Sequence, residues 1–141
     1  MKFFSSLFFV TIIAICSNVH AQVNPVSFEV NLNGDTIIFN AQIESGWHLY
    51  AANLPDPTAG PLPTEFVYND PAPELVGNVI EPMGHTEMDD AFGVEVKYFE
   101  DHTYYKQLLG SAPKIIIGTV YYMVCNDEMC IPLEYPFSIT P

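Results

Sequence analysis

Alternating apolar and polar positions recur along most of the chain, and helical periodicity is hard to find. Residues 26–32 read Val-Ser-Phe-Glu-Val-Asn-Leu, which predicts a half-buried strand. Asn33-Gly34-Asp35 tolerates positive φ and predicts a tight turn into a partner strand over 36–43. The same pattern predicts further strands over residues 46–50, 64–68, 75–80, 94–99, 114–124 and 131–139.

The segments between these strands carry turn and loop residues. Residues 54–63 hold four prolines and Gly60, so they predict an extended loop. The acidic segment 82–92 is expected to be irregular, whereas 102–109 fits either a strand or a helical turn. Trp47, the only tryptophan, is expected to anchor the core. Roughly seven to nine short strands predict an all-β, antiparallel sandwich of one domain.

The N-terminus predicts a secretory signal peptide. Met1-Lys2 is a short cationic start, residues 3–16 are almost wholly apolar, and Val19-His20-Ala21 offers a small residue at both positions that signal peptidase reads. We therefore expect a signal peptide over 1–21 and a single domain over 22–141. A membrane anchor is the alternative, although the apolar run is short for a bilayer. No other stretch is long and apolar enough to span a membrane.

The expected mature chain is strongly acidic. Three lysines face all 17 carboxylates of the sequence, which gives a net charge of 3 − 17 = −14, and there is no arginine. This balance argues against a phosphate-binding surface and excludes nucleic acid as a partner. We find no Gly-rich phosphate loop and no nucleophilic serine elbow, and we expect neither a cofactor nor a metal.

Two cysteines remain after cleavage, and export would place them where disulfides persist. Cys125 and Cys130 flank a four-residue turn between two apolar runs, so they should face each other across adjacent strands. Their Cα atoms should then lie roughly 4.5–5.5 Å apart, within reach of a disulfide. The spacing leaves three interpretations open: a structural disulfide, a redox pair, or half of a zinc site.

Other residues weigh on these interpretations. A disulfide around so short a loop stabilises the fold little through loop-closure entropy, which argues against a purely structural disulfide. The remaining histidines, His48, His85 and His102, are remote from both cysteines in sequence, which weakens the zinc reading. Asp127 and Glu128 in the turn should raise the pKa of the thiols and slow their reaction outside a docked complex.

The aromatic content offers an alternative function. Four tyrosines stand in two adjacent pairs on predicted or candidate strands, at positions 104, 105, 121 and 122. Exposed aromatic rings can form a platform for a sugar, although aromatic residues in strands more often pack in a core. Carbohydrate binding is therefore a further hypothesis to be tested on the fold.

The cysteine segment also resembles a known family. Residues 120–125 and 130–132 resemble the active-site hairpin of the N-terminal periplasmic domain of DsbD, the thiol:disulfide interchange protein. The segments Gly46–Tyr50, Gly60–Phe66 and Asp89–Gly93 agree in the same order, so the resemblance covers essentially the whole expected mature chain. It implies an immunoglobulin-like sandwich with the two cysteines on an edge hairpin.

The resemblance also implies roles for particular residues. Cys130 would form mixed disulfides with partners, and Cys125 would resolve them. Residues 89–93 would match a cap loop, with Phe92 as the aromatic shield flanked by Asp90 and Gly93, although a one-residue shift would place Ala91 there. The implied activity is that of a periplasmic thiol-disulfide oxidoreductase, exchanging electrons with thioredoxin-like domains or disulfide isomerases.

The sequence departs from the family pattern in three respects. The intercysteine loop is one residue shorter than in the best-known member, and Leu133 stands where a second proline is often found. No transmembrane conduit or thioredoxin-like domain follows, so we expect the electrons to come from a separate protein. A non-catalytic binding or adaptor domain with a structural disulfide is the competing hypothesis.

Overall fold

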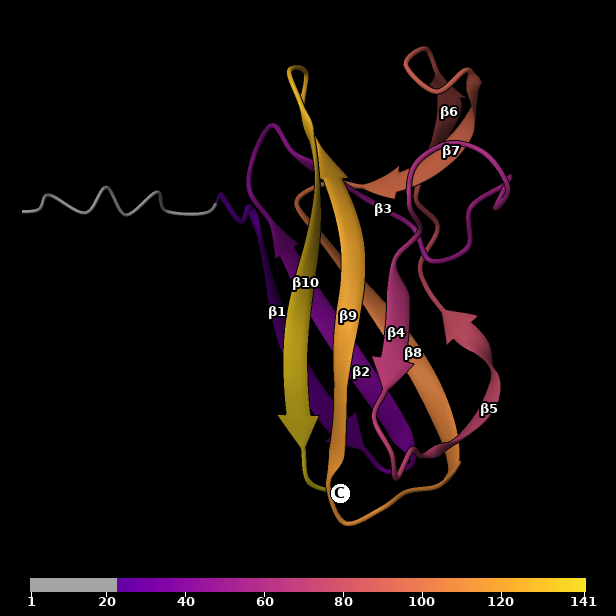
Figure 1. The fold of residues 1–141 in the computed structure, drawn as a ribbon, viewed down its shortest axis with the longest axis vertical. Helices are drawn as coiled ribbons and strands as arrows, with labels where there is room; N and C mark the ends of the chain where they lie inside the picture. Colours follow the sequence, from indigo (N-terminus) through magenta and orange to yellow (C-terminus); the bar gives the residue numbers. More distant parts are fainter. Residues whose placement is uncertain (1–22) are drawn as a thin grey trace, which may run out of the picture.

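The computed structural model describes residues 23–141, which form two β-sheets packed face to face (Figure 1). The expected signal peptide, 1–21, lies outside the described residues. The strands are β1 Val26–Asn33, β2 Thr36–Ile43, β3 His48–Tyr50, β4 Glu65–Tyr68, β5 Glu74–Ile80, β6 His85–Asp89, β7 Val94–Phe99, β8 His102–Ser111, β9 Ile116–Cys125 and β10 Cys130–Ile139. Within this part of the chain no helix is long and apolar enough to cross a bilayer.

One sheet has four strands in the order β1-β2-β8-β5. The other has six, in the order β10-β9-β3-β7-β6, with β4 also pairing with β9. All of these pairings are antiparallel. The predicted immunoglobulin-like antiparallel sandwich is therefore confirmed, and β10, which carries Cys130, is an edge strand as expected.

The segment 82–92 is not irregular throughout, because His85–Asp89 forms strand β6. β6 is the outer edge of the six-stranded sheet and pairs with β7 alone, and four of its five residues are exposed. A strand that buries neither face has no apolar alternation, so its sequence gives no strand signal. The undecided segment 102–109 lies in strand β8, where every second residue from Thr103 to Leu109 is buried.

The main core lies between the sheets and is rich in aromatic rings. Phe39 and Tyr105 are fully buried, and the Phe66 ring lies 4.5 Å and 5.2 Å from theirs. Each large apolar side chain buried in this way contributes about 1.5–3 kcal/mol. Trp47, the predicted core anchor, packs against this core just before β3, but it is only half-buried and lies at the border of the core.

Buried hydrogen bonds fix the end of β3. The Thr64 hydroxyl donates to the Tyr50 carbonyl at 2.6 Å, and the Tyr105 hydroxyl approaches the same carbonyl at 3.4 Å. Burial raises the pKa of Tyr105, so its hydroxyl keeps its proton and can act as a donor. The short strand β3 therefore rests on the main core although it has only three residues.

A buried ion pair fixes the chain directly after β3. The Glu81 carboxylate accepts the Ala52 amide at 2.8 Å and the Lys97 ammonium at 2.8 Å. The Glu81 side chain is only 3% exposed, so this charge depends on its partners to offset desolvation. Both sets of contacts thus hold the C-terminal end of β3, which pairs with the cysteine-bearing strand β9.

Candidate redox site at the cysteine hairpin

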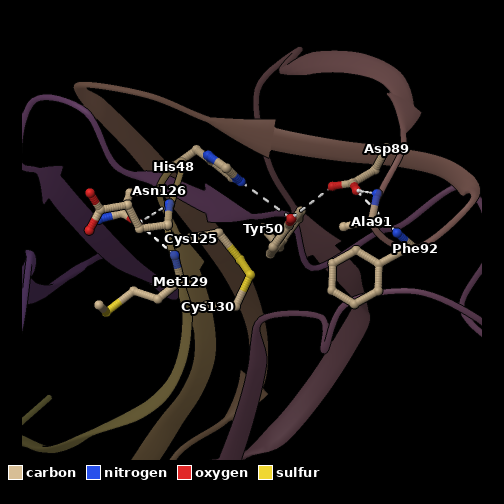
Figure 2. Close-up of a disulfide and its surroundings, with 10 residues drawn as sticks. His48, Tyr50, Asp89, Ala91, Phe92, Cys125, Asn126, Met129 and Cys130 are labelled. Atoms are coloured by element: carbon tan, nitrogen blue, oxygen red, sulfur yellow. Dashed lines mark hydrogen bonds between the residues drawn. A yellow bond between two sulfur atoms is a disulfide. The ribbon is translucent and has the colours of Figure 1, made fainter.

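Cys125 ends β9 and Cys130 begins β10, and the two residues are directly paired in the strand register. Their sulfur atoms form a disulfide, with the Cα atoms 4.1 Å apart, slightly closer than expected. The Asn126 amide donates to the Met129 carbonyl at 2.9 Å, and the Asn126 side-chain oxygen accepts the Met129 amide at 2.8 Å (Figure 2). The turn that joins the cysteines is therefore closed by its own first residue.

The two cysteines have different surroundings. Cys125 is only 2% exposed, whereas Cys130 is an exposed residue. Cys125 belongs to a small second cluster with Tyr50 and Val96, which is distinct from the main core. One half of the disulfide is thus covered by side chains and the other half faces solvent at the start of an edge strand.

The loop after β6 covers this second cluster. The Gly93 amide donates to the Asp89 carbonyl at 2.7 Å, and the Asp89 carboxylate accepts the amides of Ala91 at 2.8 Å and Phe92 at 3.2 Å. Phe92 is half-buried and packs against the cluster, whereas Ala91 and its neighbour Asp90 are exposed. In the tight turn formed by 89–93, Phe92 is therefore the residue that points toward the buried cysteine's surroundings.

The proline-rich loop supports the same turn from its other side. Gly60 has a φ of +98°, and a Cβ at its position would lie 2.8 Å from a methyl carbon of Val94 and 3.9 Å from the Cβ of Phe92. Only glycine combines this backbone conformation with so close an approach. The loop that contains Gly60 and the loop that carries Phe92 are thus packed together over the cluster.

A hydrogen-bonded network connects strand β3, which pairs with β9 beside Cys125, to the loop 89–93. The Tyr50 hydroxyl donates to the Asp89 carboxylate at 3.1 Å and lies 3.2 Å from the Nε2 atom of His48 (Figure 2). His48 stands opposite Cys125 in the register of β3 and β9, and the Tyr50 ring lies edge-on to Phe92 with centroids 6.2 Å apart. From the sequence, Tyr50 had no role of its own within the segment Gly46–Tyr50, and His48 was considered only as a possible zinc ligand.

Burial determines the protonation of Tyr50 and His48 in this network. Desolvation, followed by the Asp89 carboxylate, raises the pKa of Tyr50 well above its usual value. Desolvation lowers the pKa of His48, and the carboxylates of Asp89 and Glu100 only partly oppose it. Both groups are therefore neutral at pH 7, and the Tyr50 hydroxyl keeps the proton that it donates to the Asp89 carboxylate.

Two alternatives from the sequence can be compared with the fold. Among residues 23–141, no three His, Cys, Asp or Glu side chains converge as metal ligands. Tyr105 and Tyr122 are buried, while Tyr104 and Tyr121 are exposed on strands of different sheets. The four tyrosines therefore do not form one platform for a sugar.

These features define the class of protein: an immunoglobulin-like domain with a disulfide on an edge hairpin, in which one cysteine is buried and the other is exposed. The sequence model of the N-terminal domain of the thiol:disulfide interchange protein DsbD matches residues 19–140. Since this match covers most of the chain, the chain belongs to the DsbD N-terminal domain family. A search of curated proteins finds no match.

Solved structures support the same fold. The N-terminal domain of DsbD from Neisseria meningitidis in its reduced form is 18% identical, with a TM-score of 0.66 over 83% of this chain and 86% of that one. The same bacterium's complex between the DsbD and PilB N-terminal domains gives 15% identity and a TM-score of 0.63, over 86% of this chain and 88% of that one. The N-terminal periplasmic domain of ScsB from Proteus mirabilis is 15% identical, with a TM-score of 0.58, over 82% of this chain and 45% of that one.

Proposed function

We propose that this domain performs thiol–disulfide exchange through Cys125 and Cys130, passing reducing equivalents between a thioredoxin-like donor and oxidised exported proteins. The observation that carries the proposal is the asymmetry of the disulfide, with Cys130 exposed and Cys125 buried. Membership of the DsbD N-terminal family supports it, as does the complex in which the Neisseria domain is bound to a PilB domain. In its catalytic class the domain is a thiol-disulfide oxidoreductase.

The exchange proceeds by two displacements at sulfur. In the reduced domain the Cys130 thiolate attacks the partner's disulfide, and one partner sulfur leaves as a thiolate that takes up a proton. The Cys125 thiolate then attacks the Cys130 sulfur of the mixed disulfide and releases the second partner thiol. The domain loses two electrons and two protons, and the partner gains them. Reduction of the domain by its donor runs the same steps in reverse.

The competing function is an adaptor domain whose disulfide is an inert staple. A reduction potential above about −300 mV is expected for an exchanging pair, whereas a staple lies below that value. We expect the reduced domain to reduce an oxidised thioredoxin-fold protein with the release of one partner dithiol per domain oxidised. Because the total number of thiols does not change, the thiols are counted by alkylating the mixture and measuring the label on each protein separately. A potential below about −300 mV together with no thiol release would establish the staple.

We also propose that residues 1–21 are a signal peptide and that the mature domain works in the periplasm. The cationic start, the apolar run and the Val19-His20-Ala21 site support this assignment. The disulfide between Cys125 and Cys130 is consistent with an oxidising compartment. N-terminal sequencing of the protein recovered from a periplasmic extract is expected to begin at Gln22, and an uncleaved Met1 would contradict the proposal.

A further inference from the structure

A groove of about 750 Å³ lies on the outer face of the six-stranded sheet, beside the cysteine hairpin. It is lined mainly by Leu62, Glu65, Tyr121, Pro132, Glu134 and Pro136. The Tyr121 side chain is 43% exposed and lies between two buried neighbours in β9, so its ring belongs to the outer face. The groove therefore has an aromatic surface that the domain itself does not cover.

Two carboxylates flank this ring because of the strand register. Tyr121 is opposite Glu65 of β4 on one side and opposite Glu134 of β10 on the other, and both glutamates are exposed. Directly opposite residues have their Cβ atoms about 4.5–5.5 Å apart, so the two glutamates stand about 10 Å from each other across the ring. This separation leaves room for one cationic group above the ring.

The described part of the chain does not supply that cation. Neither Glu65 nor Glu134 has a basic partner within an ion-pair distance among residues 23–141. Lys97 is paired with Glu81, and Lys106 lies over the Tyr104 ring at 4.7 Å on the other sheet. The Lys106 contact shows the kind of cation–π interaction that Tyr121 could make with a group from another molecule.

The groove shares a face with the exposed cysteine. Exposed positions alternate along β10 with partly or fully buried residues between them, and they include Cys130, Pro132, Glu134 and Pro136. Glu134 is four residues from Cys130, which corresponds to about 13 Å along a strand. A partner joined to the domain through Cys130 would therefore extend over the groove.

We propose that this groove binds a lysine or arginine side chain of the redox partner, a thioredoxin-fold protein with that cation about 13 Å from its reactive cysteine. The charged end lies over Tyr121 between Glu65 and Glu134, and the aliphatic stem packs on Leu62 and Pro132. The inference rests on the proposed exchange function and specifies its partner. It gives the domain's acidity a specific recognition role close to the reactive sulfur.

Matched peptides test the proposal. Each peptide carries one cysteine, capped as a disulfide with mercaptoethanol, and four residues away either arginine or its neutral isostere citrulline. Cys130 attacks the capped cysteine, mercaptoethanol leaves, and Cys125 then releases the peptide thiol. The rate at which the uncapped peptide appears, followed by chromatography, therefore reports the exchange. We expect the arginine peptide to react about fivefold faster at low salt, and this preference to shrink at 0.5 M salt.

Variants locate the preference. Glu65→Gln combined with Glu134→Gln is expected to abolish it, whereas Glu29→Gln, an exposed acid on the other sheet, should leave it unchanged. Each variant's rate with the citrulline peptide shows that its fold and cysteines are intact. Equal rates for the two peptides with the wild-type domain would contradict the proposal that the groove binds a cationic side chain. A preference that persists in the double variant would contradict it as well.

The two proposals fail in different ways. A domain that reacts with neither peptide contradicts the exchange function itself. In that case, addition of the arginine peptide with serine in place of cysteine still tests the groove, because it should shift the Tyr121 ring resonances of the oxidised domain more than the citrulline peptide does. Equal shifts from the two peptides would show that the groove does not recognise the cation.

Discussion

Cys125→Ser is expected to accumulate a covalent complex with an oxidised thioredoxin-fold protein, whereas Cys130→Ser is expected to form almost none. Cys130 is exposed at the start of an edge strand, so a partner disulfide can approach its sulfur in line. Cys125 is 2% exposed and packs with Tyr50 and Val96. Nucleophilic displacement at sulfur needs an accessible attacking atom. The variant that keeps Cys130 should therefore form the covalent complex, and the variant that keeps only Cys125 should not.

The measurement is electrophoresis without reductant, after alkylation at short times. The thioredoxin-fold protein used here has only its reactive cysteine, activated as a disulfide with mercaptoethanol. The band of the mixed disulfide should then contain most of the Cys125→Ser domain, because neither protein has a second thiol to resolve it. It should disappear on addition of dithiothreitol. The variant with both cysteines replaced by serine is the control. If Cys125→Ser traps no more partner than this control, the exchange role is wrong, and equal trapping by Cys130→Ser would contradict the assignment of the attacking sulfur.

The sequence predicted the frame of this site well because its signals are local. The alternation in β1 and β2 and the hairpin pairing of Cys125 with Cys130 each depend on residues close together in the chain. Strand β6 was not predicted because both of its faces are exposed. Burial therefore imposes no alternation of apolar and polar residues on it. The place of Trp47 at the border could not be predicted, because the size of a side chain does not show whether it lies at the centre or the border of a core.

Long-range contacts explain what else could not be predicted. Tyr50 and Asp89 are 39 residues apart, and their hydrogen bond exists because β3, β7 and β6 are neighbours in one sheet. The row of Glu65, Tyr121 and Glu134 likewise arises from the register of three strands. Neither arrangement leaves a pattern in the sequence, since each depends on how distant strands align. The resemblance to a family pointed to residues 89–93, but the contacts that hold this loop come from the fold.

Phe92→Ala is expected to speed reduction of the Cys125–Cys130 disulfide by dithiothreitol about tenfold. We propose that Phe92 shields the disulfide, with Asp90 and Gly93 in the same cap loop. Its half-buried ring packs against the cluster that contains Cys125. Losing about half of a phenyl ring's burial weakens the cover by about 1–1.5 kcal/mol, and this corresponds to roughly tenfold in the fraction of open molecules. The rate is measured under excess reductant as the formation of the domain's own two thiols, at Cys125 and Cys130.

Matched variants separate the shield from a general loosening of the domain. Tyr104→Ala removes an exposed aromatic ring from the other sheet and should leave the rate unchanged. Asp89→Ala removes the acceptor of the Ala91 and Phe92 amides and should speed reduction, whereas Asp90→Ala, its exposed neighbour, should not. Urea unfolding of each variant provides the global stability against which the rates are compared.

Since the proposed cap acts by keeping reductants away from the disulfide, the effect of Phe92→Ala should depend on whether the reductant is a small thiol or a partner protein. A small thiol needs only a path to the sulfur, so Phe92→Ala should help it most. A partner protein that displaces the loop on docking already overcomes the cover, so its rate should change less. The ratio of the two rates is therefore the decisive quantity. If Phe92→Ala leaves reduction by dithiothreitol unchanged, the ring is only a packing residue. The acidic residues Asp127 and Glu128 would then be the remaining feature expected to slow the reaction of the pair.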